Sequence, residues 1–202
     1  MVQVRPYTLS DLPGLLQIQR DCFPPPYPEE QLWSKEQIAS HIRHFPQGAL
    51  CAEVDGELVG SATCLIIQFD PAHPEHTWSE VAGDGFIHTH NPGGDSLYGI
   101  DMAVRPAWRR QGVARALYAA RFELVRQLGL KRFLAGGRMP GYHRYAGRWT
   151  PEEYAAAVVR GEIDDLVITP QLRSGLRPVQ VIHNYLPDEE SANCALLLEW
   201  QP

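Results

Sequence analysis

The stretch that decides the fold runs from Asp101 to Leu128 and reads DMAVRPAWRRQGVARALYAARFELVRQL. An apolar strand ends at Pro106, because proline lacks the N–H group that a central strand needs. A short basic turn follows, and an amphipathic helix begins just after Gly112. This arrangement directs free backbone N–H groups and the positive end of a helix dipole at one spot. Such a spot binds phosphate groups.

The residues of the turn favour the same interpretation. Gly112 has no Cβ, so a ligand can approach its backbone closely, and Ala114 keeps the next exposed position small. Arg109, Arg110 and Arg115 supply guanidinium groups that suit phosphate oxygens. The alternative is an ordinary strand–turn–helix unit whose basic turn is only solvated.

The helix that follows the turn has one apolar face and a clear end. The residues of this face recur at helical spacing and are Val113, Ala116, Leu117, Ala120, Leu124 and Leu128. Gly129 is the expected C-terminal stop. The long helix between two strands, at 97–104 and 131–135, predicts a parallel strand pair with a right-handed crossover.

The turn matches one known phosphate-binding pattern and lacks two others. Neither Gly-x-Gly-x-x-Gly nor Gly-x-x-x-x-Gly-Lys-Ser/Thr is present. What remains is Arg-x-x-Gly-x-Ala, at Arg109, Gly112 and Ala114. It resembles the pyrophosphate motif of the GCN5-related N-acetyltransferase (GNAT) superfamily, Gln/Arg-x-x-Gly-x-Gly/Ala. The flanking residues also match, with Pro106 before the motif and Trp108 at its aromatic position.

Composition limits the class of protein. The 202 residues suffice for one domain with a core, and 44% hydrophobic with 21% charged residues is ordinary for a globular protein. The net charge of −6 argues against a general nucleic-acid binder. We expect no membrane partner, because no apolar run approaches a spanning length and the first residues lack a signal core. Four scattered cysteines without a Cys-x-x-Cys pair predict a reduced, cytoplasmic protein.

Local patterns predict the remaining elements. Further strands are expected at 2–5, 50–54, 57–67, 179–185 and 195–200, and helices at 11–22, 35–44 and 151–160. Asp55-Gly56 has the composition of a type I′ hairpin turn, and Ser34 and Thr150 begin capping boxes. Residues 70–95 are rich in Gly, Pro and His and are expected to form an irregular loop. We expect residues 1–202 to form a single acetyltransferase domain.

The order of these elements resembles the acetyltransferase fold. The resemblance implies a mixed α/β domain with a central twisted sheet, flanked by helices, in which two parallel strands splay apart. Acetyl-CoA, the expected co-substrate, would lie between the splayed strands 97–104 and 131–135. By position, Met102 and Val104 would pair with the pantetheine arm and the turn would hold the pyrophosphate. The implied donor-site residues are Met102, Ala103, Val104, Arg109, Arg110, Gln111, Gly112, Val113, Ala114 and Arg115.

The resemblance also implies the chemistry, which is direct attack of an amine on the thioester in a ternary complex. Tyr145 is the preferred acid for the leaving thiolate and Tyr142 the second choice, the alternative for either being a packed aromatic ring. Asp101 and Glu80 are candidate bases. A structural role for Asp101, facing solvent or an arginine, is the alternative that we weigh against catalysis.

Neither a metal nor a covalent enzyme intermediate is expected. His73, His76, His88 and His90 have spacings that can bind zinc, but no third ligand stands at a fixed spacing. Cys64 lies in an apolar strand and is expected to be a core residue rather than a nucleophile.

The segment 136–145 departs from the superfamily pattern and, with residues 151–154, resembles a bacterial subgroup. In that subgroup an acetyltransferase-like domain precedes a carbon–nitrogen hydrolase domain, which we expect to be absent here. The expected partner is a small-molecule or peptide amine, bound near 24–28, Trp33 and the 70–95 loop. The sequence leaves open whether the chain forms a homodimer. The alternative function is a non-catalytic acyl-CoA-binding sensor or interaction domain.

Overall fold

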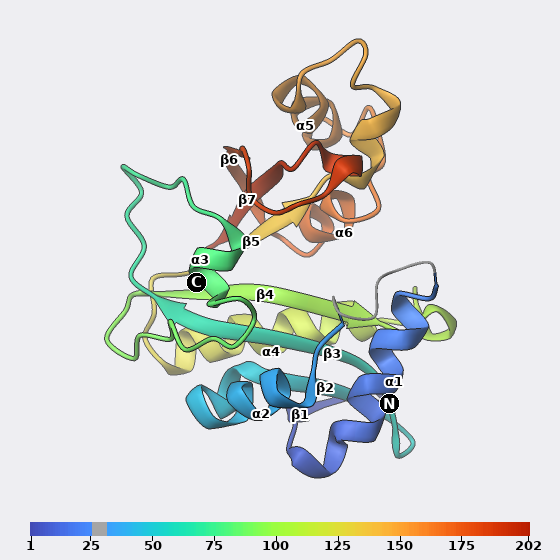
Figure 1. Cartoon of the computed structure of the whole chain (residues 1–202), viewed down its shortest axis with the longest axis vertical. Helices are drawn as coiled ribbons and strands as arrows, with labels where there is room; N and C mark the ends of the chain where they lie inside the picture. Colours follow the sequence, from blue (N-terminus) through green and yellow to red (C-terminus); the bar gives the residue numbers. More distant parts are fainter. Residues whose placement is uncertain (26–31) are drawn as a thin grey trace.

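A computed structural model describes residues 1–25 and 32–202, and Figure 1 shows its architecture. The described residues form a seven-stranded sheet with the strand order β1-β2-β3-β4-β5-β7-β6. The strands are β1 (Gln3–Pro6), β2 (Ala49–Val54), β3 (Glu57–Ile67), β4 (Ser96–Val104), β5 (Arg132–Arg138), β6 (Arg177–Ile182) and β7 (Ala195–Trp200). The helices are α1 (Leu12–Cys22), α2 (Lys35–His44), α3 (Trp78–Ala82), α4 (Val113–Gln127), α5 (Pro151–Val159) and α6 (Ile168–Arg173).

The sheet is mixed because one of its strand pairs is parallel. Strands β4 and β5, which α4 connects, pair in parallel, and the other neighbours pair antiparallel. This confirms the predicted mixed α/β fold and its strand–helix–strand unit. In Figure 1, β1 to β4 with α1, α2 and α4 form the lower half, and β5 to β7 with α5 and α6 form the upper half.

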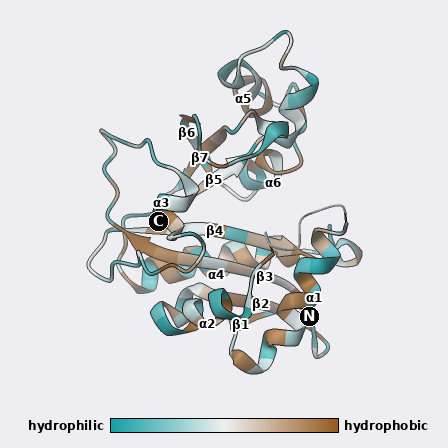
Figure 2. Ribbon diagram, viewed as in Figure 1, coloured by the Kyte–Doolittle hydropathy of each residue, from teal (hydrophilic) through white to brown (hydrophobic). Residues whose placement is uncertain are grey.

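Helices cover both faces of the lower half of the sheet. Leu15 of α1 and Ile18 pack with Ile38 of α2 on one face, and Val113 and Leu117 of α4 pack on the other. A strand covered on both faces carries apolar residues at successive positions rather than at alternate ones. Strand β3 is accordingly buried from residue 59 to residue 66, and its C-terminal part is brown in Figure 2.

Several local predictions are confirmed. Asp55 and Gly56 have φ of +50° and +84°, as a type I′ turn requires. Ser34 and Thr150 each accept a hydrogen bond from the backbone of the third helical residue. Gly129 follows α4 with a left-handed φ of +64°. Leu128 at the helix end is 41% exposed, so it does not extend the apolar face as expected.

The prediction of an irregular loop over residues 70–95 is wrong in part. Helix α3 lies within it, begun by a capping box in which Thr77 accepts from the backbone of Glu80. The sequence contains this Thr-x-x-Glu signal, which the surrounding Gly, Pro and His residues obscured. Helix α6 was also missed, because it is short and contains Pro170.

Strand ends differ from prediction where glycine or proline intervenes. Strand β5 continues through Gly136 and Gly137 to Arg138, because both glycines pair with β7. The predicted strand 179–185 is displaced, since β6 spans Arg177–Ile182 and Tyr185 lies in the following turn. The first helix begins at Leu12, after a 3-10 turn over Leu9–Asp11.

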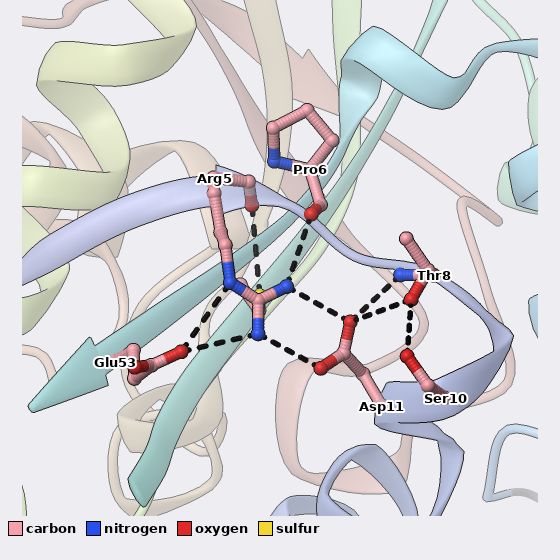
Figure 3. Close-up of polar contacts among 7 residues, drawn as sticks. Arg5, Pro6, Thr8, Ser10, Asp11 and Glu53 are labelled. Carbon is pink, nitrogen blue, oxygen red and sulfur yellow. Dashed lines mark hydrogen bonds and ion pairs between the residues drawn. The ribbon is translucent and has the colours of Figure 1, made fainter. Parts of the chain in front are cut away.

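The N-terminal strand is tied to its surroundings by Arg5. Its Nη2 lies 2.8 Å from Oδ1 of Asp11 and 3.1 Å from Oε2 of Glu53 on β2 (Figure 3). The hydrogen bond from Arg5 lowers the pKa of Asp11 to about 2. Asp11 also accepts from the backbone of Thr8, so one carboxylate orders the turn that leads into α1.

The entry into β4 depends on a close approach between two backbones. The N–H of Asp95 donates to the carbonyl of Ile67 at 3.0 Å, and a Cβ on Gly94 would overlap the backbone of Ile67. Gly93, its neighbour, has only the side chain of Asn91 within 4 Å of such an atom.

We therefore expect Gly94→Ala to lower the free energy of unfolding by about 1 to 3 kcal/mol, because the end of β3 must shift to admit the methyl group. Gly93→Ala is the matched control and should leave stability nearly unchanged. Chemical denaturation monitored by circular dichroism measures both. Equal stabilities of the two variants would contradict this account.

Candidate active site

The central feature of the site is the point where β4 and β5 part. Their parallel pairing covers Ser96–Gly99 against Arg132–Ala135 and ends there. Beyond it, β4 pairs only with β3, and β5 pairs only with β7. The edge of β4 that faces β5 is therefore unpaired over residues 100–104. We call this divergence the fork.

A β-bulge in β4 begins the fork. Gly99 lies opposite Cys64 of β3 and Asp101 lies opposite Thr63, so Ile100 has no partner in β3. A bulge bends its strand and reverses the faces of the residues that follow it. Gly99 accordingly faces Arg121 of α4, whereas Ala103 packs in the cluster formed by α1 and α2.

Two side chains bind the carbonyl groups that the bulge leaves without a strand partner. Nε1 of Trp78 in α3 donates to the Ile100 carbonyl at 3.1 Å. Nη2 of Arg121 in α4 donates to the Asp101 carbonyl. Buried carbonyl groups need such partners. These two donors stabilise the open form of β4 without a neighbouring strand.

The turn before α4 presents the second part of the site. Arg110 and Gly112 have φ of +61° and +85°, and a Cβ on Gly112 would meet nothing within 4 Å. The backbone N–H groups of residues 110–115 donate no hydrogen bond to any acceptor in residues 1–25 and 32–202. An unsatisfied helix N-terminus preceded by left-handed residues forms an anion-binding concavity.

The arginines of this turn are placed for an anion. Arg109, Arg110 and Arg115 are exposed and form no ion pair in the described part of the chain. Nε of Arg109 donates to the carbonyl of Val104, so the turn is anchored to the end of β4. Arg105 differs, because it pairs with Asp21 and Glu57 and has a structural role.

Asp101 lies at the fork with its carboxyl group in contact with an indole. Nε1 of Trp33 donates to Oδ2 of Asp101 at 3.0 Å, and Trp33 stacks on Trp78 with ring centroids 6.0 Å apart. Burial raises the pKa of Asp101, and the hydrogen bond from Trp33 and the charge of Arg121 only partly oppose this. A carboxylate of raised pKa is a stronger base than an ordinary aspartate, so it is suited to accept a proton from a substrate group.

Arg121 is the main charged group beneath the fork. The residue is 2% exposed, and its guanidinium lies over Tyr118 and Phe133 at 5.5 and 5.4 Å from the ring centroids. Sequence reasoning missed Arg121. The available signal was a charged residue four positions after Leu117 on the apolar face of α4.

The two predicted catalytic tyrosines have different surroundings. The Tyr142 hydroxyl donates to the Trp149 carbonyl at 2.9 Å and the residue is buried. Tyr145 stacks on Trp149, with centroids 5.0 Å apart, and lies beside Tyr154. Its hydroxyl is not hydrogen-bonded to another residue that the structure describes.

The other predicted candidates have local structural partners. The Glu80 carboxylate accepts from the N–H and hydroxyl of Thr77, as part of the α3 cap. Cys64 is fully buried. Residues 26–28 of the predicted acceptor loop lie outside the described residues. Among the residues that are described, no three His, Cys, Asp or Glu side chains are grouped to hold a metal ion.

None of the helices of the described chain combines the length and apolar character needed to cross a membrane.

A comparison with family models matches residues 12–147 to the acetyltransferase (GNAT) family. The chain is 43% identical over 198 residues to the uncharacterized N-acetyltransferase YkwB of Bacillus subtilis (strain 168). That match covers 98% of this chain and 88% of YkwB.

Two further similarities extend the comparison. The chain is 42% identical over 192 residues to the probable hydrolase YhcX of Bacillus subtilis (strain 168), covering 95% of this chain but 37% of YhcX. Its fold is similar to that of the GphF GNAT-like decarboxylase in complex with isobutyryl-CoA. The TM-score is 0.78 at 23% identity, with 98% of each chain covered.

The raised pKa of Asp101 predicts a pH-dependent stability effect. The unfolded chain releases the Asp101 proton at a lower pH than the folded chain does, so ionisation favours unfolding as pH rises. We expect Asp101→Asn, which keeps an oxygen for Trp33, to be at least as stable as wild type at about pH 7. The difference should disappear at about pH 3, below the ordinary aspartate pKa.

Asp188→Asn is the matched control, and its expected change in stability has the opposite sign. Burial works to raise the pKa of Asp188, but hydrogen bonds from Arg138 and Ser191 outweigh it and lower the pKa. This variant should lose stability at about pH 7 and approach wild type at about pH 3. Urea denaturation at both pH values measures the two effects. Destabilisation of Asp101→Asn at neutral pH would refute the burial argument.

Proposed function

This chain belongs to the acetyltransferase (GNAT) family, and we propose that it transfers an acetyl group from acetyl-CoA to a primary amine by direct attack in a ternary complex. The observation that carries the proposal is the pairing of the fork with the basic turn. The fork leaves one strand edge open for an extended ligand. The turn offers unbonded N–H groups and guanidinium groups for a pyrophosphate.

The donor would run from the turn to the fork. Residues 109–115 bind the pyrophosphate, and Met102, Ala103 and Val104 present the free edge of β4 to the pantetheine arm, as an added strand would pair. Support for a CoA-type donor comes from the GNAT-like decarboxylase of similar fold, whose structure contains isobutyryl-CoA. The Gly112 position, open around its backbone, gives the pyrophosphate room.

The residues at the fork would carry out the proton transfers. Asp101, with its raised pKa, holds the amine beside the thioester and accepts a proton from its nitrogen. Tyr145 gives a proton to the departing CoA thiolate, and Tyr142 is the second candidate. Tyr142 would first have to break its bond to the Trp149 carbonyl, which favours Tyr145.

The match to YhcX suggests which part of a longer protein this chain resembles. Because the chain covers 37% of that probable hydrolase, we propose that it corresponds to the acetyltransferase-like part of such proteins. Hydrolase activity is not part of the proposal. A cytoplasmic location and a small-molecule or peptide amine acceptor complete it.

Gly112→Leu tests the donor site. The side chain would enter the open space beside the turn, so we expect acetyl-CoA affinity to fall at least about tenfold, or 1.4 kcal/mol. Gly129→Leu is the matched control, since Gly129 is left-handed, surrounded by open space and at the opposite end of α4. Isothermal titration calorimetry measures the acetyl-CoA affinity. Thermal denaturation shows whether the two substitutions lower the melting temperature to a similar extent. Equal affinities for acetyl-CoA would refute the donor site.

Tyr145→Phe tests the acid. Loss of the hydroxyl should lower kcat by about a hundredfold while acetyl-CoA affinity is retained, measured as amine-dependent thiol release. Tyr142→Phe should cost less activity, because its hydroxyl already serves the Trp149 carbonyl. Wild-type turnover by Tyr145→Phe would exclude it as the acid. Binding of acetyl-CoA with no amine-dependent thiol release by the wild type would instead indicate a non-catalytic acyl-CoA-binding module.

A further inference from the structure

Three side chains from distant parts of the sequence form a hydrogen-bonded chain beside the fork. Nε2 of His76 lies 2.7 Å from the hydroxyl of Tyr98, which lies 3.0 Å from the hydroxyl of Tyr185. His76 precedes α3, Tyr98 is on β4 and Tyr185 follows β6. The backbone joins the same elements, because the N–H of Trp78 donates to the Tyr185 carbonyl at 2.7 Å.

The direction of these hydrogen bonds is fixed at one end. Nδ1 of His76 lies 2.7 Å from the Pro74 carbonyl, which can only accept, so Nδ1 carries the ring proton. In the neutral ring Nε2 is then an acceptor, and the Tyr98 hydroxyl must donate to it. Tyr185 donates in turn to Tyr98. The oxygen of Tyr185 keeps a lone pair that can accept a proton from a ligand.

The Tyr185 end of the chain lies at the fork. A Cβ on Gly136, the first β5 residue beyond the pairing with β4, would overlap the Tyr185 ring and hydroxyl. Tyr98 is one residue before Gly99, where the pairing ends on β4. Tyr185 also lines a hollow of about 330 Å³, of which Trp78 forms another wall.

The His76 end of the chain opens on the other side of α3. His76 is half-buried and lines a second hollow of about 400 Å³. The chain of hydroxyl groups thus connects the fork with a separate solvent-facing hollow. The charged or titratable side chains around His76 in that hollow are Asp70, His73, Glu75 and Glu80.

A second histidine–tyrosine pair shows what a purely structural arrangement looks like here. His41 bonds the Gly85 carbonyl at 2.6 Å and the Tyr7 hydroxyl at 2.8 Å, and it is 0% exposed. Burial lowers the pKa of His41 to about 4. Buried without an outlet, His41 cannot release a proton to water, whereas His76 borders a hollow.

The proposed acetyl transfer requires two protons to leave the acceptor nitrogen. An alkylammonium becomes an amide, one proton ends on the CoA thiol, and the other is released to water. Asp101 and the tyrosine acid account for the first proton. The second needs its own route from the fork to solvent.

We propose that His76, Tyr98 and Tyr185 form a proton relay that carries one proton from the acceptor ammonium at the fork to the hollow at His76. This inference rests on the proposed function. One N–H bond of the ammonium breaks as its proton passes to the Tyr185 oxygen. The Tyr185 proton moves to Tyr98, and the Tyr98 proton moves to Nε2 of His76. The positive charge passes from nitrogen to the imidazolium of His76. The imidazolium then gives its Nδ1 proton to water in the hollow, and the ring returns to the Nδ1–H form before the next turnover.

The surroundings suit each group to its part. Burial raises the pKa of Tyr98 and of Tyr185, so both hydroxyls stay protonated and pass protons without ionising. Burial lowers the pKa of His76, against the opposing effects of the Pro74 carbonyl and of the Glu75 and Glu80 charges. His76 is therefore neutral and able to accept at neutral pH. In the proposed relay, Tyr185 receives the proton of the ammonium, Tyr98 passes a proton on, and His76 acts through both tyrosines.

The test uses His76→Gln, Tyr98→Phe and Tyr185→Phe in the whole chain, with an alkylamine that the wild type acetylates. At about pH 7 each variant should lose about a hundredfold in kcat and keep wild-type affinity for acetyl-CoA. The deficit should shrink toward about pH 10, where the amine arrives already deprotonated and needs no relay. Because the groups act in series, the His76→Gln/Tyr98→Phe double variant should lose no more than the worse single variant.

His143→Gln is the matched control. Nδ1 of His143 also bonds a proline carbonyl, that of Pro140 at 2.6 Å, but His143 is exposed and bonds no tyrosine. Its kcat should stay within about twofold of wild type, as expected for a surface substitution. Adding imidazole to His76→Ala should restore activity, since the hollow admits a small base.

A wild-type kcat of His76→Gln at neutral pH would refute the relay. So would losses of kcat that are the same at every pH and that add up in the double variant. Those results leave the proposed acetyl transfer intact. Absence of amine-dependent thiol release by the wild-type chain would refute the transferase proposal itself, and with it the relay.

Discussion

The end of the parallel pairing between β4 and β5 is the constraint on which the rest of the structure depends. Once pairing stops at Gly99, the bulge at Ile100 turns the carbonyl groups of β4 away from a strand partner, and buried carbonyls need donors. Trp78 supplies one from α3 and Arg121 supplies another from α4. The open strand edge is therefore held from both sides of the sheet before any ligand arrives, which lowers the cost of ordering a bound ligand.

The same constraint gathers the polar groups of the site. The bulge places the Asp101 carboxyl on the face where Trp33 binds it, and places Arg121 below it. Elsewhere in the chain the balance is reversed: burial raises the pKa of Asp101, whereas hydrogen bonds from Arg138 and Ser191 outweigh burial and lower the pKa of Asp188. A raised pKa makes the carboxylate of Asp101 a stronger base than an ordinary aspartate, as its proposed role requires.

Sequence reasoning succeeded where a local rule determines the structure. Pro106 ends a strand, Gly129 ends a helix, and the Arg109 to Ala114 turn identifies the family, because each depends on a few adjacent residues. Strand β5 was cut short at Ala135, since Gly136 and Gly137 have the composition of a turn. Their lack of side chains is required by packing, because Cβ atoms there would meet Tyr185 and α6.

The polar network of the site could not be predicted in the same way. Tyr98 and Tyr185 are 87 residues apart, and Trp33 and Asp101 are 68 apart. Only the folded sheet brings them together, so neither contact leaves a pattern in a single sequence. The cap at Thr77 was the one local signal for α3, the helix that brings Trp78 to the fork.

Amide hydrogen exchange with and without acetyl-CoA tests the central claim most directly. The N–H groups of residues 110–115 have no acceptor among the described residues and should exchange quickly in the free chain. Saturating acetyl-CoA should slow exchange in this turn and along the free edge of β4 at residues 100–104. Unchanged exchange in both segments, with or without protection elsewhere, would contradict the assignment of the fork and the turn as the donor site.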